Sequence, residues 1–172
     1  MDLAYKNRAG VAVRPAGPQD AEAIREIRNR AIERSTALWT NTVLSATDGA
    51  AWLDPHLRRG SAFVAEADGA VAGFGAYGPW RDFEGYRHTV EDSVYVHEDH
   101  HRRGVGAALL TAVIDAARHA GHRIVIADIE AGNTASIKLH ERFGFHHVGT
   151  VGDAGTKFGT WLDLTIMRLP LR

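Results

Sequence analysis

The chain has 172 residues, of which 45% are hydrophobic and 24% charged, and a formal net charge of −1; this favours one globular domain and argues against binding nucleic acid by bulk charge. It contains no cysteine, which excludes disulfides, cysteine-based zinc sites and acyl transfer through a covalent cysteine. No apolar run approaches the ~18 residues of a membrane span, and residues 1–10 lack a signal-peptide pattern, so we expect a cytoplasmic protein that does not bind membranes.

The spacing of apolar residues predicts three strands and two helices in the first half of the chain. They follow a short lead at 1–10 and are a strand at 11–14, a helix at 18–34, a less regular helix at 46–59, and strands at 61–67 and 70–77. Asp68 and Gly69 predict a tight hairpin turn between the last two. The loop at 78–86 that follows carries three aromatic residues and an arginine, a content typical of ligand-binding loops.

The stretch from Glu91 to Gly121 is the most informative part of the sequence. A strand is predicted at 91–97 and a helix from the turn at 104–106 up to Gly121. Between them lie Arg102 and Arg103, followed by glycines at 104 and 106. A glycine turn that leads from a strand into a helix N-terminus suits a pyrophosphate, because the first helical N–H groups lack partners within the helix.

This turn does not match the dinucleotide fingerprint, because Leu109 occupies the place of the third glycine. It resembles the acyl-CoA signature of the GNAT superfamily of N-acetyltransferases, with His101 in place of the usual Gln or Arg. Taken alone, the short motif fits an ordinary glycine-containing loop equally well.

The second half of the chain predicts strands at 123–130, 145–150 and 160–167 and a helix at 134–143 capped by Asn133. The first of these strands is far enough along the chain to pair in parallel with the strand at 91–97 as a βαβ unit. The order of elements resembles the GNAT fold. That resemblance implies an α/β protein with a mixed, mostly antiparallel sheet of about seven strands flanked by helices, and a parallel βαβ unit at the acetyl-CoA site.

A closer resemblance spans residues 11–169, which we interpret as a single domain. The segments that carry it are Trp80-Arg81, Phe83 to Arg87, Thr89 to Glu91, Ser93 to Val96, Ile129 to Asn133, Ala135 to Ile137, Leu139 to Arg142, Gly144-Phe145, Lys157 to Gly159 and Trp161 to Leu164. They are similar to the phosphinothricin and methionine sulfone/sulfoximine acetyltransferases. The resemblance implies acetyl-CoA as co-substrate, a small-molecule amine as acceptor and a homodimer.

The resemblance also implies roles for individual residues. The acetyl-CoA site would consist of Val94, Tyr95, Val96, Arg102, Arg103, Gly104, Val105, Gly106, Ala107 and Asn133. The amino-acid site would be lined by Arg81, Asp82, Phe83, Glu91, Asp92 and Ser93. The chain departs from the family pattern at Arg28, Val43, Asp82 and Asp92, and the two aspartates bear on the choice of substrate.

Two residues are candidates for proton transfer. Glu91 shares a strand face with Ser93 and Tyr95 and is the candidate base for the amine, although its position alone fits a solvated strand residue. His140 lies on one helix face with Asn133 and Ile137 and is the candidate acid for the leaving thiolate; a surface histidine is the alternative. Five further histidines, at 97, 100, 101, 146 and 147, lack cysteine or carboxylate partners at a defined spacing, so we expect no metal.

We therefore expect an N-acetyltransferase that moves acetyl directly from acetyl-CoA to the α-amine of methionine sulfone, methionine sulfoximine or phosphinothricin. Two alternatives remain open. One is acetylation of a polyamine or a peptide N-terminus, which the acids at 82, 84, 91 and 92 permit. The other is a non-catalytic CoA-binding sensor.

Overall fold

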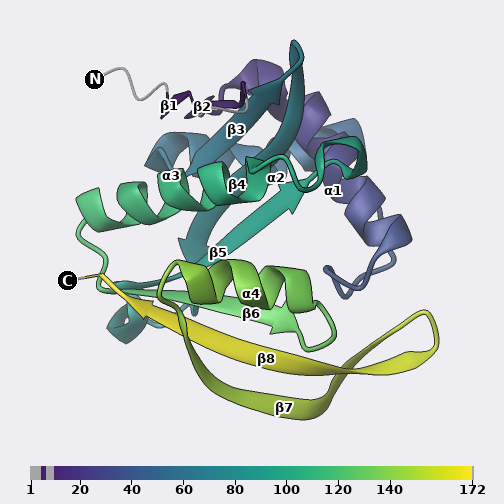
Figure 1. The fold of residues 1–172 in the computed structure, drawn as a ribbon, viewed down its shortest axis with the longest axis vertical. Coiled ribbons are helices and arrows are strands. Elements are labelled where there is room, and N and C mark those ends of the chain that lie inside the picture. Colours follow the sequence, from purple (N-terminus) through teal and green to yellow (C-terminus); the bar gives the residue numbers. More distant parts are fainter. Residues whose placement is uncertain (1–4, 7–9, 172) are drawn as a thin grey trace.

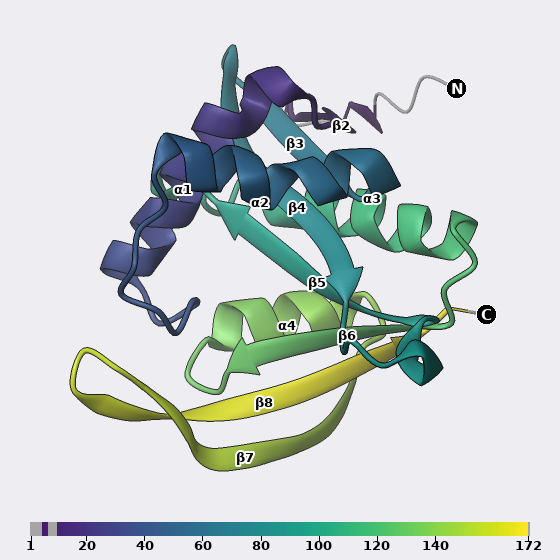
Figure 2. The same ribbon diagram turned by 180° about the vertical axis from the view of Figure 1, so that it is seen from behind.

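The computed structural model describes residues 5–6 and 10–171, which form one mixed sheet flanked by helices. The strand order is β1-β2-β3-β4-β5-β6-β8-β7. The strands are β1 (Tyr5–Lys6), β2 (Ala12–Pro15), β3 (Ala62–Ala67), β4 (Ala70–Pro79), β5 (Thr89–Val96), β6 (Ile124–Glu130), β7 (His146–Lys157) and β8 (Thr160–Pro170). Helices α1 (Ala21–Arg34) and α2 (Ala46–Arg59) cover one face, and α3 (Val105–His119) and α4 (Thr134–Arg142) cover the other (Figures 1 and 2).

The expected fold class is confirmed, with one parallel pair among antiparallel neighbours in the described residues. The element order is as predicted, and α2 begins and ends at the predicted residues because Ser45 caps its start and Gly60 adopts the left-handed conformation at its end. One strand was not predicted. It is β1, which lies within the stretch 1–10 expected to be a lead and pairs with β2. The rest of that expected lead, residues 1–4 and 7–9, lies outside the described residues.

The β7–β8 pair is longer than predicted, because the sequence indicated strands only at 145–150 and 160–167. Residues 151–156 are exposed or half-exposed and carry glycines at 152 and 155, so they show no apolar alternation. They are extended because they pair with β8, across a register shift between Val151 and Gly155. The pair runs along the outer edge of the sheet as a curved arm (Figure 1).

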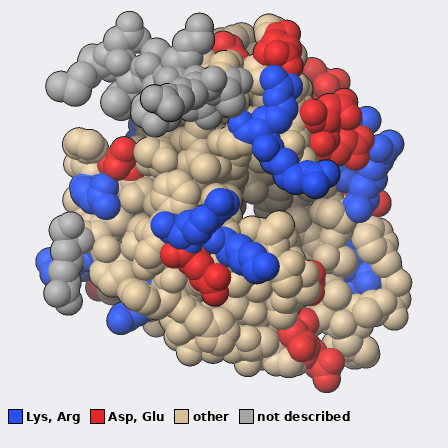
Figure 3. Space-filling view, viewed as in Figure 1, with Lys and Arg blue, Asp and Glu red and all other residues tan. Residues whose placement is uncertain are grey.

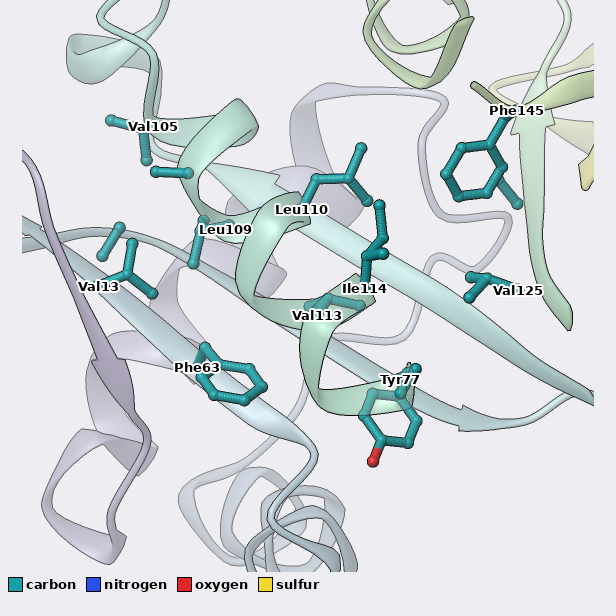
Figure 4. Packing of buried hydrophobic residues seen from close by; sticks show 14 of the residues in the cluster. Val13, Phe63, Tyr77, Val105, Leu109, Leu110, Val113, Ile114, Val125 and Phe145 are labelled. Carbon is teal, nitrogen blue, oxygen red and sulfur yellow. The ribbon is translucent and has the colours of Figure 1, made fainter. Parts of the chain in front are cut away.

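The main core lies between α3 and the sheet. It includes α3 residues Val105, Leu109, Leu110 and Val113, which pack over β2, β3 and β4 (Figure 4). A smaller apolar cluster fills the opposite face, where Ile24 and Ile27 of α1 and Leu53 of α2 pack on Val64 and Phe74. Since both faces of the sheet are covered, β5 at its centre is positioned from both sides.

The two parallel strands pair over only part of their length. Their register joins Thr89 to Ile124, Val90 to Val125 and Glu91 to Ile126, and no further pairs follow among the described residues. Beyond Glu91 the strands diverge, which is visible from both sides (Figures 1 and 2). β5 stays paired with β4 as far as Val96, so its other edge opens into the gap between β5 and β6.

Candidate active site

The gap between the diverging strands holds a cavity of about 60 Å³. Its lining comes from β5, β6, α4 and the loop after α1, and consists of Ala37, Asp92, Ser93, Val94, Tyr95, Ala127, Asp128, Ile129, Glu130, Asn133, Ser136 and His140. Alternate backbone groups of β5 past Glu91 face away from β4 and toward this cavity. The cavity thus offers backbone hydrogen-bonding groups beside several titratable side chains.

The alternation of β5 divides its side chains between two environments. Val94 and Val96 pack with the core under α3, whereas Tyr95 packs with the cluster under α1 and α2. Glu91 and Ser93 share the face of Tyr95, and Asp92 shares the face of Val94. Asp92, which the family resemblance grouped with the amino-acid site, therefore lies on the opposite face from Glu91 and Ser93, against α4.

Glu91 is a half-buried carboxyl group next to the last parallel pair. Burial, together with the negative charges of Asp128 and Asp92, raises its pKa to about 7. A carboxyl group with this pKa exchanges protons near neutral pH, as a general base must. Asp128 was not predicted as a site residue, although it is the only charged residue of the otherwise apolar stretch 124–129.

His140 and Asp92 form a buried pair. The Nε2 atom of His140 lies 3.0 Å from Oδ2 of Asp92, and the exposed fractions of the two side chains are 4% and 2%. Nδ1 of His140 donates to the backbone carbonyl of Ser136 at 2.8 Å. Burial opposes charge on the ring, but the hydrogen bond and negative charge of Asp92, aided by the Ser136 carbonyl, raise the pKa of His140 above its ordinary value.

With an acceptor at each ring nitrogen, His140 is arranged to carry two protons and to stay charged beside Asp92. The Oδ1 atom of Asp92 is also buried and makes no hydrogen bond within the described part of the chain. Because both residues line the cavity, the pair places a hydrogen-bonded proton at its wall. No local sequence pattern indicates this pairing, which joins residues 48 positions apart.

The turn that leads into α3 has the geometry of an anion site. Arg102 and Gly104 have positive φ angles of 59° and 81°, and Gly104 caps the helix in the left-handed conformation. The N–H groups at 105–107 begin the helix and have no acceptor within it. A Cβ atom on Gly106 would lie 3.4 Å from Leu139 of α4 and 3.7 Å from Val96, so this glycine lies where α3, α4 and β5 meet.

Basic side chains gather over α4 and over the turn before α3, on two sides of a hollow in this face (Figure 3). The Lys and Arg residues of these two segments are Arg102, Arg103, Lys138 and Arg142. Arg103 forms an ion pair with Asp68 of the β3–β4 turn at 2.6 Å. His101, the departure from the signature, donates through Nε2 to the backbone carbonyl of Val96 at 3.0 Å and so ties the turn to the end of β5.

The other predicted amino-acid-site residues lie on the loop between β4 and β5. Arg81, Asp82 and Phe83 are all exposed, and 78% of Phe83 is accessible. The guanidinium of Arg81 lies 4.5 Å from the ring of Trp80. Burial raises the pKa of Asp128, and Trp80 and Arg81 partly oppose this rise, which places this loop near the Glu91 face.

The loop after α1 is held over the cavity by contacts that the sequence did not indicate. Buried Lys157 of β7 donates to the carbonyls of Ser35 and Leu38, both at 2.6 Å. Thr36 donates to Glu130 at 3.1 Å. Ala37, between these anchors, is part of the cavity lining.

Two kinds of feature are absent from the described residues. Within 5–6 and 10–171, no group of three or more His, Asp or Glu side chains is arranged to hold a metal ion. None of the helices in that part of the chain combines the length and apolar character needed to cross a membrane.

Comparison with known proteins gives consistent matches. Residues 23–145 match the model of the Acetyltransferase (GNAT) family. The chain is 44% identical to an L-methionine sulfoximine/L-methionine sulfone acetyltransferase of Pseudomonas paraeruginosa over 93% of this chain and 94% of that protein. It is 36% identical to a phosphinothricin N-acetyltransferase of Streptomyces viridochromogenes over 91% of this chain and 86% of that protein. An acetyltransferase structure from Salmonella typhimurium with acetyl-CoA superposes with a TM-score of 0.92, at 40% identity over 94% of both chains.

Proposed function

Because this chain belongs to the acetyltransferase (GNAT) family, we propose that it moves acetyl from acetyl-CoA to the α-amine of a small amino-acid analogue such as methionine sulfone or methionine sulfoximine. The observation that carries the proposal is the placement of Glu91. Its carboxyl group, with a pKa of about 7, stands where the parallel strands separate, beside the cavity. The chain has no cysteine, so we propose direct transfer within a ternary complex.

In this mechanism Glu91 accepts a proton from the acceptor ammonium, directly or through water, and so exposes the lone pair of the nitrogen. Backbone N–H groups of β5 in the cavity stabilise the oxyanion that forms when the amine attacks the thioester. The Asp92–His140 pair supplies the proton that the departing thiolate takes up. The attacking nitrogen loses its second proton through water as the amide forms, and that proton restores the pair. The first turn of α3, with Arg102 and Arg103, holds the pyrophosphate of acetyl-CoA, and Asn133 lies near the sulfur.

The acceptor site is proposed on the face of β5 that carries Glu91 and Ser93. Arg81 presents a planar guanidinium suited to an oxygen-rich head group, while Trp80 and Phe83 offer apolar walls to a short methylene stem. The negative charges of Asp82 and Asp128 on this side disfavour an anionic side chain such as that of phosphinothricin. The curated relative at 44% identity carries the sulfoximine and sulfone in its name, which supports the same ranking.

A panel of acceptors tests this proposal. We expect kcat/KM, measured by thiol release from acetyl-CoA, to be highest for methionine sulfone and methionine sulfoximine and lower for phosphinothricin. Spermidine and a short peptide serve as controls for the polyamine and peptide alternatives. A preference for either control would overturn the assignment of the substrate but would leave the assignment of acetyltransferase activity intact. Binding of acetyl-CoA without thiol release to any acceptor would support a sensor instead.

Gly106→Val tests the proposed acetyl-CoA site. The added methyl groups would stand over the first turn of α3, next to Leu139 and Val96, and obstruct the approach of the phosphates. We expect acetyl-CoA binding to weaken by at least about 10-fold, equal to 1.4 kcal/mol, while the fold is kept because the φ angle of Gly106 is not positive. Gly106→Ala, which adds only one methyl group, should weaken acetyl-CoA binding less than Gly106→Val does. Equal binding by wild type and a folded Gly106→Val, measured by calorimetry, would place the site elsewhere.

The proposal also includes a homodimer in the cytoplasm, acting on small molecules and binding neither nucleic acid nor membrane. The dimer is supported by apolar side chains that are exposed on the β7–β8 arm. They are Val148, Val151, Phe158 and Trp161, with accessible fractions from 49% to 66%. A second copy of the chain would bury these side chains, which lie on the same β7–β8 arm as Lys157, the residue that anchors the loop over the cavity.

A further inference from the structure

Arg28 is a half-buried arginine that has no counter-ion among the described residues. Its Nε atom is fully buried and makes no hydrogen bond, and its terminal nitrogens have no acceptor among the described residues. The guanidinium carbon lies 4.8 Å from the ring of Trp52. Burial lowers the pKa of Arg28, an effect opposed only by Tyr95, so the charge is held at a cost in free energy.

The other arginines of α1 show how unusual this is. Arg25 forms an ion pair with Glu22 at 2.5 Å. Arg30 and Arg34 both pair with Glu98, at 3.2 and 3.1 Å. Buried charges in proteins are normally paired, so an anion that the described residues do not supply would complete the surroundings of Arg28.

Arg28 lies on the acceptor side of the sheet. It neighbours Tyr95, which lines the cavity and shares its strand face with Ser93 and Glu91. Trp52 and Tyr95 both pack on Phe74, with ring centroids 5.6 and 5.2 Å apart, and so form an apolar wall beside the guanidinium. The terminal nitrogens are not among the fully buried atoms, so they remain open to a ligand.

Charges along this face therefore run from negative to positive. The carboxyl groups of Glu91 and Asp128 lie at one end, and Arg28 lies near Tyr95 at the other. This order matches a zwitterion whose ammonium faces Glu91. We propose that Arg28 binds the α-carboxylate of the acceptor, which leaves Arg81 for the polar head group of its side chain. The assignment rests on the proposed function, because it takes an amino acid as the acceptor.

The test compares methionine sulfone with its α-carboxamide in wild type, Arg28→Met and Arg81→Met. Wild type should prefer the carboxylate, because a charge-assisted hydrogen bond is lost with the amide. In Arg28→Met that preference, measured as a ratio of kcat/KM values, should fall by roughly 10- to 100-fold. Arg81→Met should retain it. The amide also changes the basicity of the α-amine, but this effect is the same in every enzyme and cancels in the comparison.

Stability separates a binding role from a structural one. Arg28→Met replaces an uncompensated charge with an apolar chain of similar length, so unfolding in urea without acceptor should require as much denaturant as wild type or more. A clearly less stable variant would indicate that Arg28 serves to pack Trp52, and would overturn the proposal.

The remaining outcomes are distinct. If Arg28→Met keeps the wild-type preference for carboxylate over amide, Arg28 does not bind the carboxylate, and the proposed function stands. If the wild-type enzyme acetylates neither methionine sulfone nor its amide, the proposed acceptor class is wrong and this assignment falls with it.

Discussion

Replacing Glu91 with glutamine should lower kcat by about 10²- to 10⁴-fold and leave acetyl-CoA binding close to that of wild type. The side chain keeps its shape but can no longer accept the proton of the acceptor ammonium. In wild type the rate should rise with pH through about 7, where Glu91 becomes ionised. Glu91→Gln should lack this rise, which a pH profile of kcat/KM measures.

Asp128→Asn is the matched control for this experiment. Its carboxylate is one of the charges that raise the pKa of Glu91, so its removal should shift the rise in rate to lower pH without abolishing turnover. Wild-type turnover in Glu91→Gln at every pH would remove Glu91 from the mechanism. An unshifted profile in Asp128→Asn would show that Asp128 does not act on Glu91.

The same carboxyl group makes a prediction about stability. Since the folded protein holds the proton of Glu91 up to a higher pH than the unfolded chain, wild type should lose stability as pH rises from about 4.5 toward 7. The loss due to this group is on the order of 2 kcal/mol, discounted for its partial exposure. In urea unfolding across this pH range, the free energy of unfolding of Glu91→Gln should change with pH by that amount less than the free energy of unfolding of wild type.

Sequence patterns predicted the elements around the site well, because local signals determine them. The hairpin turn at Asp68-Gly69 adopts two positive φ angles, 54° and 78°, as its residue types predict. Asn133 caps α4 by accepting from the N–H of Ser136, again as predicted. The β7–β8 arm was underestimated because its outer half has no buried face, and alternation appears only where one face is buried.

Long-range pairing explains what the sequence did not indicate about the site. In the sequence, Asp92 is simply an acidic residue of a predicted strand. Only the packing of α4 on that face of the sheet shows that Asp92 forms a hydrogen bond with His140. In the sequence, Arg28 is an ordinary charged residue of a predicted helix. Its lack of a counter-ion among the described residues becomes apparent only when the fold places Trp52 and Tyr95 beside it. Asp128 requires the register of the parallel pair before it can be placed beside Glu91.

His140→Ala should be costly in two ways, because it removes one partner of a buried charged pair. Asp92 would be left as a buried carboxylate without its hydrogen bond, which typically costs about 3–5 kcal/mol of folding free energy. Turnover should also fall, by about 10²- to 10⁴-fold, because the proton for the leaving thiolate is gone. Urea unfolding and kcat at fixed pH measure the two effects separately.

The neutral pair Asp92→Asn with His140→Gln separates stability from chemistry. An amide can donate to an amide across this contact, so much of the lost stability should return, but no titrating proton is present and turnover should stay low. The raised pKa of His140 also predicts how stability depends on pH. The stabilisation from protonated His140 is fully present below its ordinary pKa of 6.5 and is lost as pH rises through the pKa of the folded state. The stability gap between wild type and His140→Ala should therefore narrow at alkaline pH. If the neutral pair turns over like wild type, the Asp92–His140 pair is structural and the thiolate takes its proton from water.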